Sequence, residues 1–387
     1  MSLFTHRAYW RWSAGVQFAR LPATMAPLAF TLLTTATTGS YRLGGVLMSV
    51  YVVAEMTGAV PVGRLLDRVG VTRGLPALLL LTAAGFAVLA FAASASASAS
   101  AAAPTAVLLA LVMLPGATAG ALSGGFRTLL ADTVDDALLP RAISVDAMLL
   151  EGVLIGGPAL VALLDLAGPF VPLAAMAAAC VGAAVLVPRR AAEREREEAG
   201  PDVPPVGVGT YLPWLCCAFT VGLLLSTIEV APLPLVQRLG APDTAAPVVI
   251  AVLSGASIVG SALYAWRGKT GDPRLFLGGF IVGGLALAGD FGWPGLIASV
   301  AVIGGCTGPL VAATSVNLQR LLPKNRRSAG FSLSFTVQAC GFGLGSLAVG
   351  VLPLWLAPVF GVFAAAIAGA MLVAKPAGAI GTTSVTS

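Results

Sequence analysis

The sequence predicts an all-α polytopic membrane protein with twelve transmembrane helices, and three observations carry this prediction. Of its 387 residues, 57% are hydrophobic and only 10% are charged. The mean hydropathy of +0.93 is too high for a water-soluble chain of this length, which would have to expose much of that apolar surface. The apolar residues also occur in runs of about 20, the length that a helix needs to cross a hydrocarbon core about 30 Å thick.

Twelve apolar runs follow one another along the chain, with boundaries set to within about four residues. They span residues 12–37, 41–62, 75–93, 104–125, 142–164, 168–188, 209–231, 246–266, 275–290, 294–318, 328–350 and 353–373. None of them alternates polar and apolar residues, and all exceed the about ten residues of a membrane-spanning strand. The runs therefore predict helices.

The basic residues set the orientation and test the helix count. With the N-terminus inside, 19 of the 22 Lys and Arg residues fall in cytoplasmic segments, while Arg42 and Arg238 fall outside and Arg20 lies within a helix. This bias follows the positive-inside rule, and it would disappear if the count were wrong by one in the first half. The net charge of +5 then reflects topology and gives no reason to expect nucleic acid. We expect a multi-pass protein of a bacterial inner membrane with both termini in the cytoplasm.

One hydrophilic segment divides the runs into six and six. It contains RRAAEREREEAGPDVPP, residues 189–205, and its charges and prolines predict a cytoplasmic linker. The predicted domains are an N-terminal six-helix bundle at 1–188, the linker at 189–207, and a C-terminal bundle with a short tail at 208–387. The halves are weakly similar: Glu151 and Gln338 lie at corresponding depths in the fifth and eleventh runs.

A short charged motif separates the second and third runs. In GRLLDRVGVTRG, residues 63–74, the residues that match a known signature are Gly63, Leu65, Asp67, Arg68 and Gly70. They resemble the G-x-L-x-D-R-x-G-R-K loop of the major facilitator superfamily. Where that family has two basic residues, this sequence has Val71 and Thr72, followed by Arg73. The resemblance extends to twelve spans in two pseudo-symmetric six-helix bundles, and so to essentially the whole chain.

The resemblance implies that this motif is a cytoplasmic gating loop, a breakable latch between the two bundles. Its glycines allow two helix ends to approach closely, and Asp67 is expected to meet either a helix N-terminus or an arginine. Arg64, Arg68 and Arg73 are expected to hold the turn on the inner side. The alternative is that these charges only fix the topology.

Ionisable residues inside apolar runs are candidate functional groups, because a charge in the hydrocarbon core costs several kcal/mol. Arg20 and Glu55 are each predicted about 12 Å from the cytoplasmic end of neighbouring antiparallel helices, well placed to pair. Such a pair suits substrate binding or proton exchange. The alternatives are a permanent structural salt bridge, or an Arg20 side chain that extends toward the interface.

Glu151 is the leading candidate for proton coupling. It is predicted about 15 Å deep, near the midplane, without a basic residue on its own helix. Low dielectric favours a protonated carboxyl group, which suits a residue that takes up and releases a proton. The alternative is that Glu151 only forms a hydrogen bond, for instance to Gln338.

Glu229 is predicted to lie toward the outer face. It could form part of an outer gate, bind a substrate amine, or be a partly hydrated carboxylate at the interface. Asp146 is predicted to be solvated.

After Glu151 comes GVLIGGPALVALL. Its Gly156, Gly157 and Pro158 resemble the glycine-proline motif of proton antiporters in the same superfamily. The match is partial, because Val161 and Ala162 stand in place of the expected second glycine pair. It favours export slightly.

Together these features predict a secondary active transporter that works by alternating access, with proton-coupled export of a lipophilic or weakly cationic drug or secondary metabolite. The expected partners are the small-molecule substrate, protons and the bilayer, and the protein is expected to be monomeric. One alternative is an uptake symporter for a sugar or an amino acid, and another is a transport-inactive sensor or scaffold. We expect no enzyme activity, no cofactor and no metal centre, since the only histidine is His6.

Overall fold

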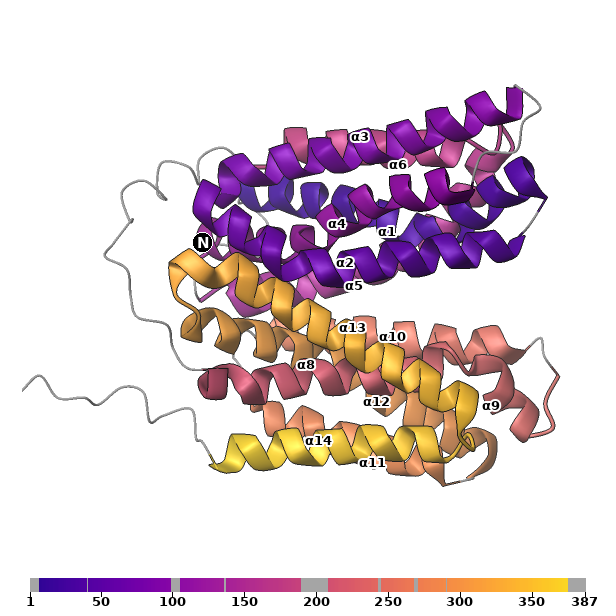
Figure 1. Ribbon diagram of the computed structural model, residues 1–387. Helices are drawn as coiled ribbons and strands as arrows, with labels where there is room; N and C mark the ends of the chain where they lie inside the picture. The colour runs from indigo at the N-terminus through magenta and orange to yellow at the C-terminus, as the bar shows by residue number, and fades with distance from the viewer. Residues whose placement is uncertain are drawn as a thin grey trace, which may run out of the picture. The chain divides into compact units, whose positions relative to one another are not determined.

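The computed structural model describes residues 7–39, 41–98, 105–135, 137–188, 208–242, 245–267, 271–289 and 291–374. Its long helices are α1 (Arg7–Thr38), α2 (Tyr41–Val69), α3 (Val71–Ser98), α4 (Thr105–Thr133), α5 (Leu139–Asp165), α6 (Val171–Leu186), α8 (Val208–Glu229), α10 (Ala246–Arg267), α11 (Pro273–Ala288), α12 (Gly292–Leu321), α13 (Arg327–Val351) and α14 (Leu356–Ala374). Two short elements accompany them, α9 (Pro232–Arg238) and the 3-10 turn η3 (Lys324–Arg326) (Figure 1).

Nine helices in the described part of the chain are long and apolar enough to cross a membrane. α6 and α11 are apolar but have only 16 residues each, and α1 carries Arg7, Arg11 and Arg20. With these three, the described residues contain the twelve long helices that the sequence predicted. The short helix α9 was not predicted as a separate element. Pro232 begins it, because a proline that cannot continue α8 is well suited to a first helical turn.

The segment between α2 and α3 is much shorter than predicted. Residues 63–74 were expected to form a loop, but α2 continues to Val69 and α3 begins at Val71. Only Gly70 interrupts the helices, with a φ of 89° that a residue with a Cβ rarely adopts. Its N–H donates to Leu66 O at 2.9 Å and so closes the last turn of α2. The charged residues of the motif therefore lie on helix ends.

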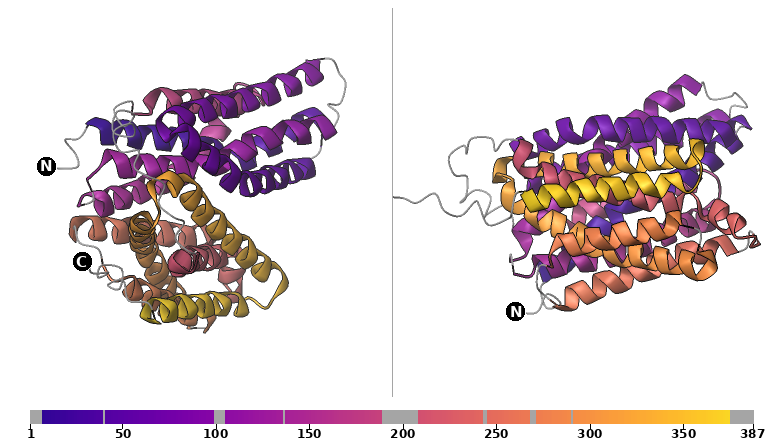
Figure 2. Two further views of the ribbon diagram at one scale, coloured as in Figure 1. Left: turned by 60° about the vertical axis from the view of Figure 1, so that its left-hand side comes forward. Right: turned by 90° about the horizontal axis from the view of Figure 1, so that it is seen from below.

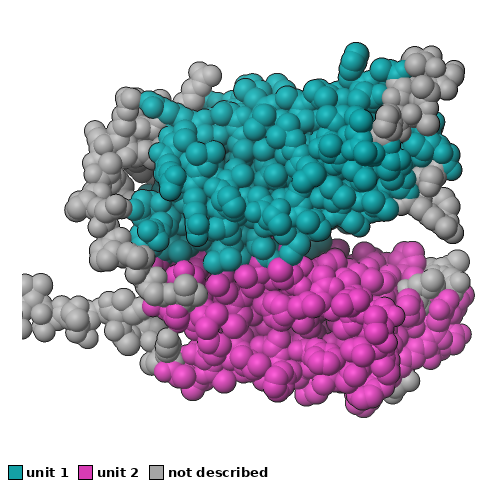
Figure 3. Space-filling model, in the orientation of Figure 1, with its two compact units in different colours: residues 1–142, 149–204, 322–336 teal, residues 143–148, 205–321, 337–387 magenta. Residues whose placement is uncertain are grey.

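The chain forms two compact units (Figure 3). Unit 1 comprises residues 1–142, 149–204 and 322–336, and unit 2 comprises residues 143–148, 205–321 and 337–387. The units therefore differ from two consecutive halves of the chain. A short stretch of α5 groups with unit 2, while η3 and the start of α13 group with unit 1. The predicted linker at 189–207 lies outside the described residues.

The same set of helix neighbours occurs in each unit. In unit 1, α2 packs on α4, α3 on α4 and α6, and α1 on α6. In unit 2, α10 packs on α12, α11 on α12 and α14, and α8 on α14. Figure 1 shows most of the helices of each unit lying lengthwise beside one another, and Figure 2 shows the same helices from two further sides. This repetition is the pseudo-symmetry expected of two six-helix bundles. The core of unit 1 is built around Phe30, Tyr51 and Phe86, whose rings contact in series.

Candidate functional site

A cavity lies inside unit 1, between α1, α2, α3, α4 and α6. It offers about 440 Å³ of space between the helices, part of it open to the surface. Most of its lining is apolar. The residues that line it are Val16, Ala19, Arg20, Pro22, Ala23, Tyr51, Glu55, Thr82, Ala119, Leu122, Ser123, Phe126 and Cys180. Two of the ionisable residues predicted from the sequence, Arg20 and Glu55, thus face one space.

Glu55 is placed in the cavity by close packing of α2 on α4. Gly120 of α4 lies directly against the backbone carbonyl of Glu55, where a Cβ would find no room. The side chain of Glu55 is half-buried. It makes no hydrogen bond and no ion pair with any other residue that the structure describes. A carboxylate of this kind is chemically able to bind a proton or a cation from the cavity.

Arg20 shares the cavity with Glu55, but the predicted ion pair between them is not formed. The guanidinium instead lies along its own helix, where Nη1 donates to Gln17 Oε1 at 3.4 Å. Gln17 lies one turn earlier on α1, so this hydrogen bond is formed within a single helix. The two opposite charges lie in one cavity without joining, which leaves Glu55 available to other ligands.

Hydroxyl groups complete the polar part of the lining. The Thr82 hydroxyl of α3 lies 2.8 Å from Thr118 Oγ1 of α4 and 2.8 Å from Leu78 O, and it shares its one hydrogen between these two acceptors. Tyr51 is 1% exposed and packs its ring between Phe30 and Phe86. The cavity is therefore a mainly apolar space with one acid, one base and a few hydroxyls, a composition typical of sites for small organic ligands.

The three other predicted site residues lie elsewhere. Glu151 is half-buried on α5 and does not line this cavity. Gln338 is half-buried on α13 and belongs to unit 2, whereas Glu151 belongs to unit 1. The backbone carbonyl of Gln338 packs against Gly222 of α8. Glu229 is the exposed last residue of α8.

A second polar site in unit 1 is formed where Asp67 meets the start of α13. Asp67 Oδ1 accepts a hydrogen bond from the N–H of Ser328 at 2.9 Å, and Oδ2 accepts one from the N–H of Ala329 at 2.9 Å. These N–H groups belong to the first turn of α13, whose positive dipole end stabilises a carboxylate. The sequence left two possible partners for Asp67, a helix N-terminus or an arginine. In the structure its carboxylate accepts hydrogen bonds from a helix N-terminus. We call this arrangement the Asp67 clamp.

Other contacts strengthen the Asp67 clamp. Arg327 lies 3.5 Å from Asp132 of α4, and Ser328 Oγ donates to Thr128 Oγ1 of α4 at 3.3 Å. A Cβ on Gly63 would lie 3.0 Å from Ala329 Cα, so this glycine allows α2 to approach α13. Arg68 and Arg73 are exposed on the adjoining helix ends.

The glycine-proline motif of α5 is a packing site. Gly157 lies against Thr24 of α1 so closely that a Cβ would collide with the threonine side chain. A Cβ on Gly156 would meet nothing within 4 Å, and Pro158 lies within the helix. The motif therefore joins α5 to α1, the helix that carries Arg20.

One buried charged residue differs from the prediction made from the sequence. Asp146, predicted to be solvated, is 1% exposed and lies in the stretch of α5 that groups with unit 2. Arg127 is also buried: it is 5% exposed within α4, with its guanidinium carbon 6.0 Å from the centroid of the Phe335 ring. Depth along a helix was estimated from residue counts, which give no information about the face on which a side chain lies. No group of three or more potential metal-ligating His, Cys, Asp or Glu side chains occurs among the described residues.

Comparison with known proteins places this geometry in a family. A family model described as Major Facilitator Superfamily matches residues 14–288. No curated protein sequence matches the chain. Among solved structures, a bacterial homologue of the iron transporter ferroportin in an outward-facing state with soaked iron is similar with a TM-score of 0.75 and 17% identity, over 95% of this chain and 99% of that one.

Two further solved structures are similar. The human organic anion transporter MFSD10 (TETRAN) has a TM-score of 0.73 and 16% identity, over 95% of this chain and 99% of its own. The proton:xylose symporter XylE bound to 6-bromo-6-deoxy-D-glucose has a TM-score of 0.69 and 13% identity, over 95% and 94%. At these identities the likeness shows a common fold.

Proposed function

Because the chain belongs to the major facilitator superfamily, we propose that it is a proton-coupled exporter of a lipophilic or weakly cationic small molecule. Its family and fold make it a secondary transporter in a membrane. The proposal adds three points to this: the direction of transport is export, the coupling ion is the proton, and the cargo is a lipophilic or weakly cationic molecule. In such a transporter, two bundles expose a central site first to one side of the membrane and then to the other.

The observation that supports this proposal best is Glu55 in the cavity of unit 1. An ionised carboxylate without an ionic partner is costly inside a membrane, and either a proton or a cationic cargo removes that cost. Because both neutralise the same group, each displaces the other, and this competition is the basis of exchange. In the proposed cycle, Arg20 attracts the ionised, empty carboxylate until the next ligand arrives. The apolar lining favours a cargo with an extended apolar surface.

Glu151 is the second candidate for the coupling carboxyl, and Glu55 is favoured because it lines a cavity. The Asp67 clamp is proposed to be the gate on the cytoplasmic side. This assignment rests on the distribution of basic residues, which also supports a bacterial inner membrane and two cytoplasmic termini. Breaking the Asp67 clamp would release the start of α13 from α2.

Transport by purified protein in liposomes tests the proposal. With an imposed pH gradient, we expect movement of tetraphenylphosphonium, used as a lipophilic cation probe, against its own gradient. Glu55→Gln should abolish this coupled movement, whereas the exposed Glu229→Gln serves as a matched control and should retain it. Loss in Glu151→Gln with full activity in Glu55→Gln would transfer the coupling role to Glu151. Accumulation of a sugar, with no movement of the cation, would refute the exporter proposal in favour of uptake.

A further inference from the structure

Three exposed arginines lie where α2 ends and α3 begins, in unit 1. Arg64 and Arg68 are one turn apart on α2, and Arg73 lies in the first turn of α3, just beyond the joint at Gly70. In the part of the chain that the structure describes, none of these three guanidinium groups forms a hydrogen bond or an ion pair. They differ in this from Asp67, whose two carboxylate oxygens are occupied in the Asp67 clamp.

Packing on two sides of α2 determines which of its residues stay exposed. Gly63 and Asp67 lie against the start of α13, and Leu66 lies against Gly74 at the start of α3. A helix turns by about 100° per residue, so positions 64, 65, 68 and 69 share the arc that remains. We call these four positions the exposed arc of α2.

The exposed arc of α2 has a basic half and an apolar half. Leu65 and Val69 lie one turn apart, beside the two arginines, and are 56% and 51% exposed. The arginine side chains have apolar stems that can lie along such a surface while the guanidinium groups stay in a polar layer. A surface of this kind is complementary to an amphiphile with an anionic head.

The length of α2 puts this arc at the membrane surface. With 29 residues at about 1.5 Å each, α2 is about 43 Å long, which exceeds a hydrocarbon core of about 30 Å. Its apolar run ends at residue 62, so the residues after Gly63 extend into the headgroup region. Phospholipids of the surrounding leaflet therefore have direct access to the exposed arc of α2.

The charge of this region favours a phosphate group. A fourth arginine, Arg326, is exposed in η3, which packs against α2. Arg64 and Arg68 repel each other at this spacing, and a bound anion removes the repulsion. Each guanidinium also presents its donors in a fixed fork that matches phosphate oxygens. Clusters of four or more basic side chains next to a membrane helix attract anionic lipids.

We propose that the exposed arc of α2 binds an anionic phospholipid, with the headgroup phosphate on Arg64 and Arg68. The first part of an acyl chain lies on Leu65 and Val69, and the other two arginines add to the attraction. The site requires only that this end of α2 lies at a membrane surface. It does not depend on the cargo, the coupling ion or the direction of transport.

Native mass spectrometry of the delipidated, detergent-solubilised full chain tests this site. We expect phosphatidylglycerol to bind more tightly than phosphatidylcholine. Loss of one basic side chain near a membrane surface weakens binding of an anionic lipid by about fivefold, so the double variant Arg64→Gln with Arg68→Gln should weaken it by about 25-fold. Arg64→Lys with Arg68→Lys keeps both charges and should retain most of the binding, which separates loss of charge from damage to the fold.

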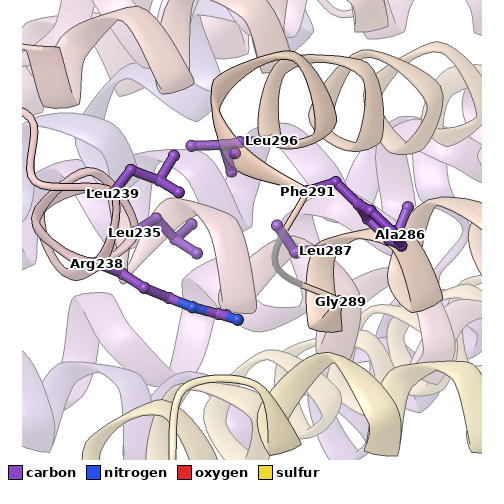
Figure 4. A pocket seen from close by; sticks show the side chains of 9 residues that line it. Leu235, Arg238, Leu239, Ala286, Leu287, Gly289, Phe291 and Leu296 are labelled. Atoms are coloured by element: carbon purple, nitrogen blue, oxygen red, sulfur yellow. The ribbon is translucent and has the colours of Figure 1, made fainter.

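Arg238→Gln is the matched control. Arg238 is the exposed last residue of α9 in unit 2, and its Nη2 donates to Ala288 O at 3.5 Å. Figure 4 shows its side chain extended beside a small pocket of about 20 Å³. Because this arginine lies in the other unit, its removal should leave phosphatidylglycerol binding at the exposed arc of α2 unchanged.

Leu65→Gln tests the apolar half of the arc. It should weaken binding of long-chain phosphatidylglycerol and leave the weaker attraction of glycerol phosphate unchanged. Equal affinity for phosphatidylglycerol and phosphatidylcholine, or unchanged binding in the double glutamine variant, would refute the site. Glycerol phosphate that competes as well as phosphatidylglycerol would also refute it, because the arginines would then bind a free anion and the acyl chain would contribute nothing.

Discussion

At the scale of single residues, Asp67 shows how one carboxylate can join distant parts of the chain. It lies at the end of α2 and bonds two N–H groups that come 261 and 262 residues later. Asp272 offers a useful contrast, because it caps its own helix α11 through the N–H of Arg274 at 3.0 Å. The same residue type thus stabilises a helix N-terminus in both places, but only Asp67 does so across the fold.

Asp67→Asn should weaken the Asp67 clamp, because an amide oxygen accepts fewer hydrogen bonds and carries no charge to oppose the helix dipole. We expect a loss of about 1–2 kcal/mol in the free energy of unfolding, seen as a lower Tm in detergent, together with greater exposure of the start of α13 to hydrogen exchange. Asp272→Asn is the control and should affect only the start of α11. Unchanged exchange at residues 327–332 in Asp67→Asn would contradict the Asp67 clamp.

Asp146 is the residue that the sequence placed least well. A buried carboxyl group at 1% exposure is held by its surroundings, and removing it leaves polar groups without their partner. We therefore expect Asp146→Ala to reduce the free energy of unfolding by about 1–3 kcal/mol. The exposed Asp135→Ala should have almost no effect. Equal Tm values for the two variants would show that Asp146 contributes nothing to unit 2.

At the scale of elements, glycines set the distance between paired helices. Gly116 and Gly120 of α4 lie against the backbone of α2, and Gly304 and Gly308 of α12 lie against α10. Both pairs have the G-x-x-x-G spacing that puts two glycines on one face of a membrane helix. This spacing is visible in the sequence and could have predicted that α4 and α12 each have a closely packed face, although not which helix packs on it.

Gly120→Ala tests this close packing where it supports Glu55. The added methyl group would collide with the Glu55 carbonyl and push α2 away from α4, at a cost of about 1–3 kcal/mol for an overpacked contact. We expect a lower Tm and weaker cation transport. Gly156→Ala, at an open position of α5, is the matched control and should be neutral or slightly stabilising. An unaltered Tm in Gly120→Ala would mean that α2 and α4 have room to separate.

At the scale of the whole molecule, composition and charge were enough to predict the fold. The lengths of the apolar runs predicted the twelve helices, and the motif at 63–74 predicted the family. Both predictions succeed because they depend only on local sequence. The pairing of residues on different helices depends on rotation about each helix axis, which residue counts do not contain. For this reason Arg20 and Glu55 were correctly assigned to neighbouring helices although they do not pair in the structure, and the burial of Asp146 was missed.

The orientation in the membrane is a separate prediction of the charge distribution. In a variant whose native cysteines are replaced, Val69→Cys and Phe291→Cys each place one thiol at an exposed position. In intact cells we expect a membrane-impermeant maleimide to label Phe291→Cys only, with Val69→Cys labelled after permeabilisation. Labelling of Val69→Cys in intact cells would invert the topology and remove the Asp67 clamp from the cytoplasmic side.

The most direct test of the central claim is the pH dependence of cation binding to the purified protein, measured by calorimetry with tetraphenylphosphonium. If proton and cation compete for Glu55, cation binding releases a proton into the buffer, and affinity rises by about tenfold per pH unit while that carboxyl group is protonated. Glu55→Gln should abolish the proton release, and Glu229→Gln should preserve it. Affinity that does not change with pH in the unmodified protein, with no proton released, would contradict exchange at Glu55.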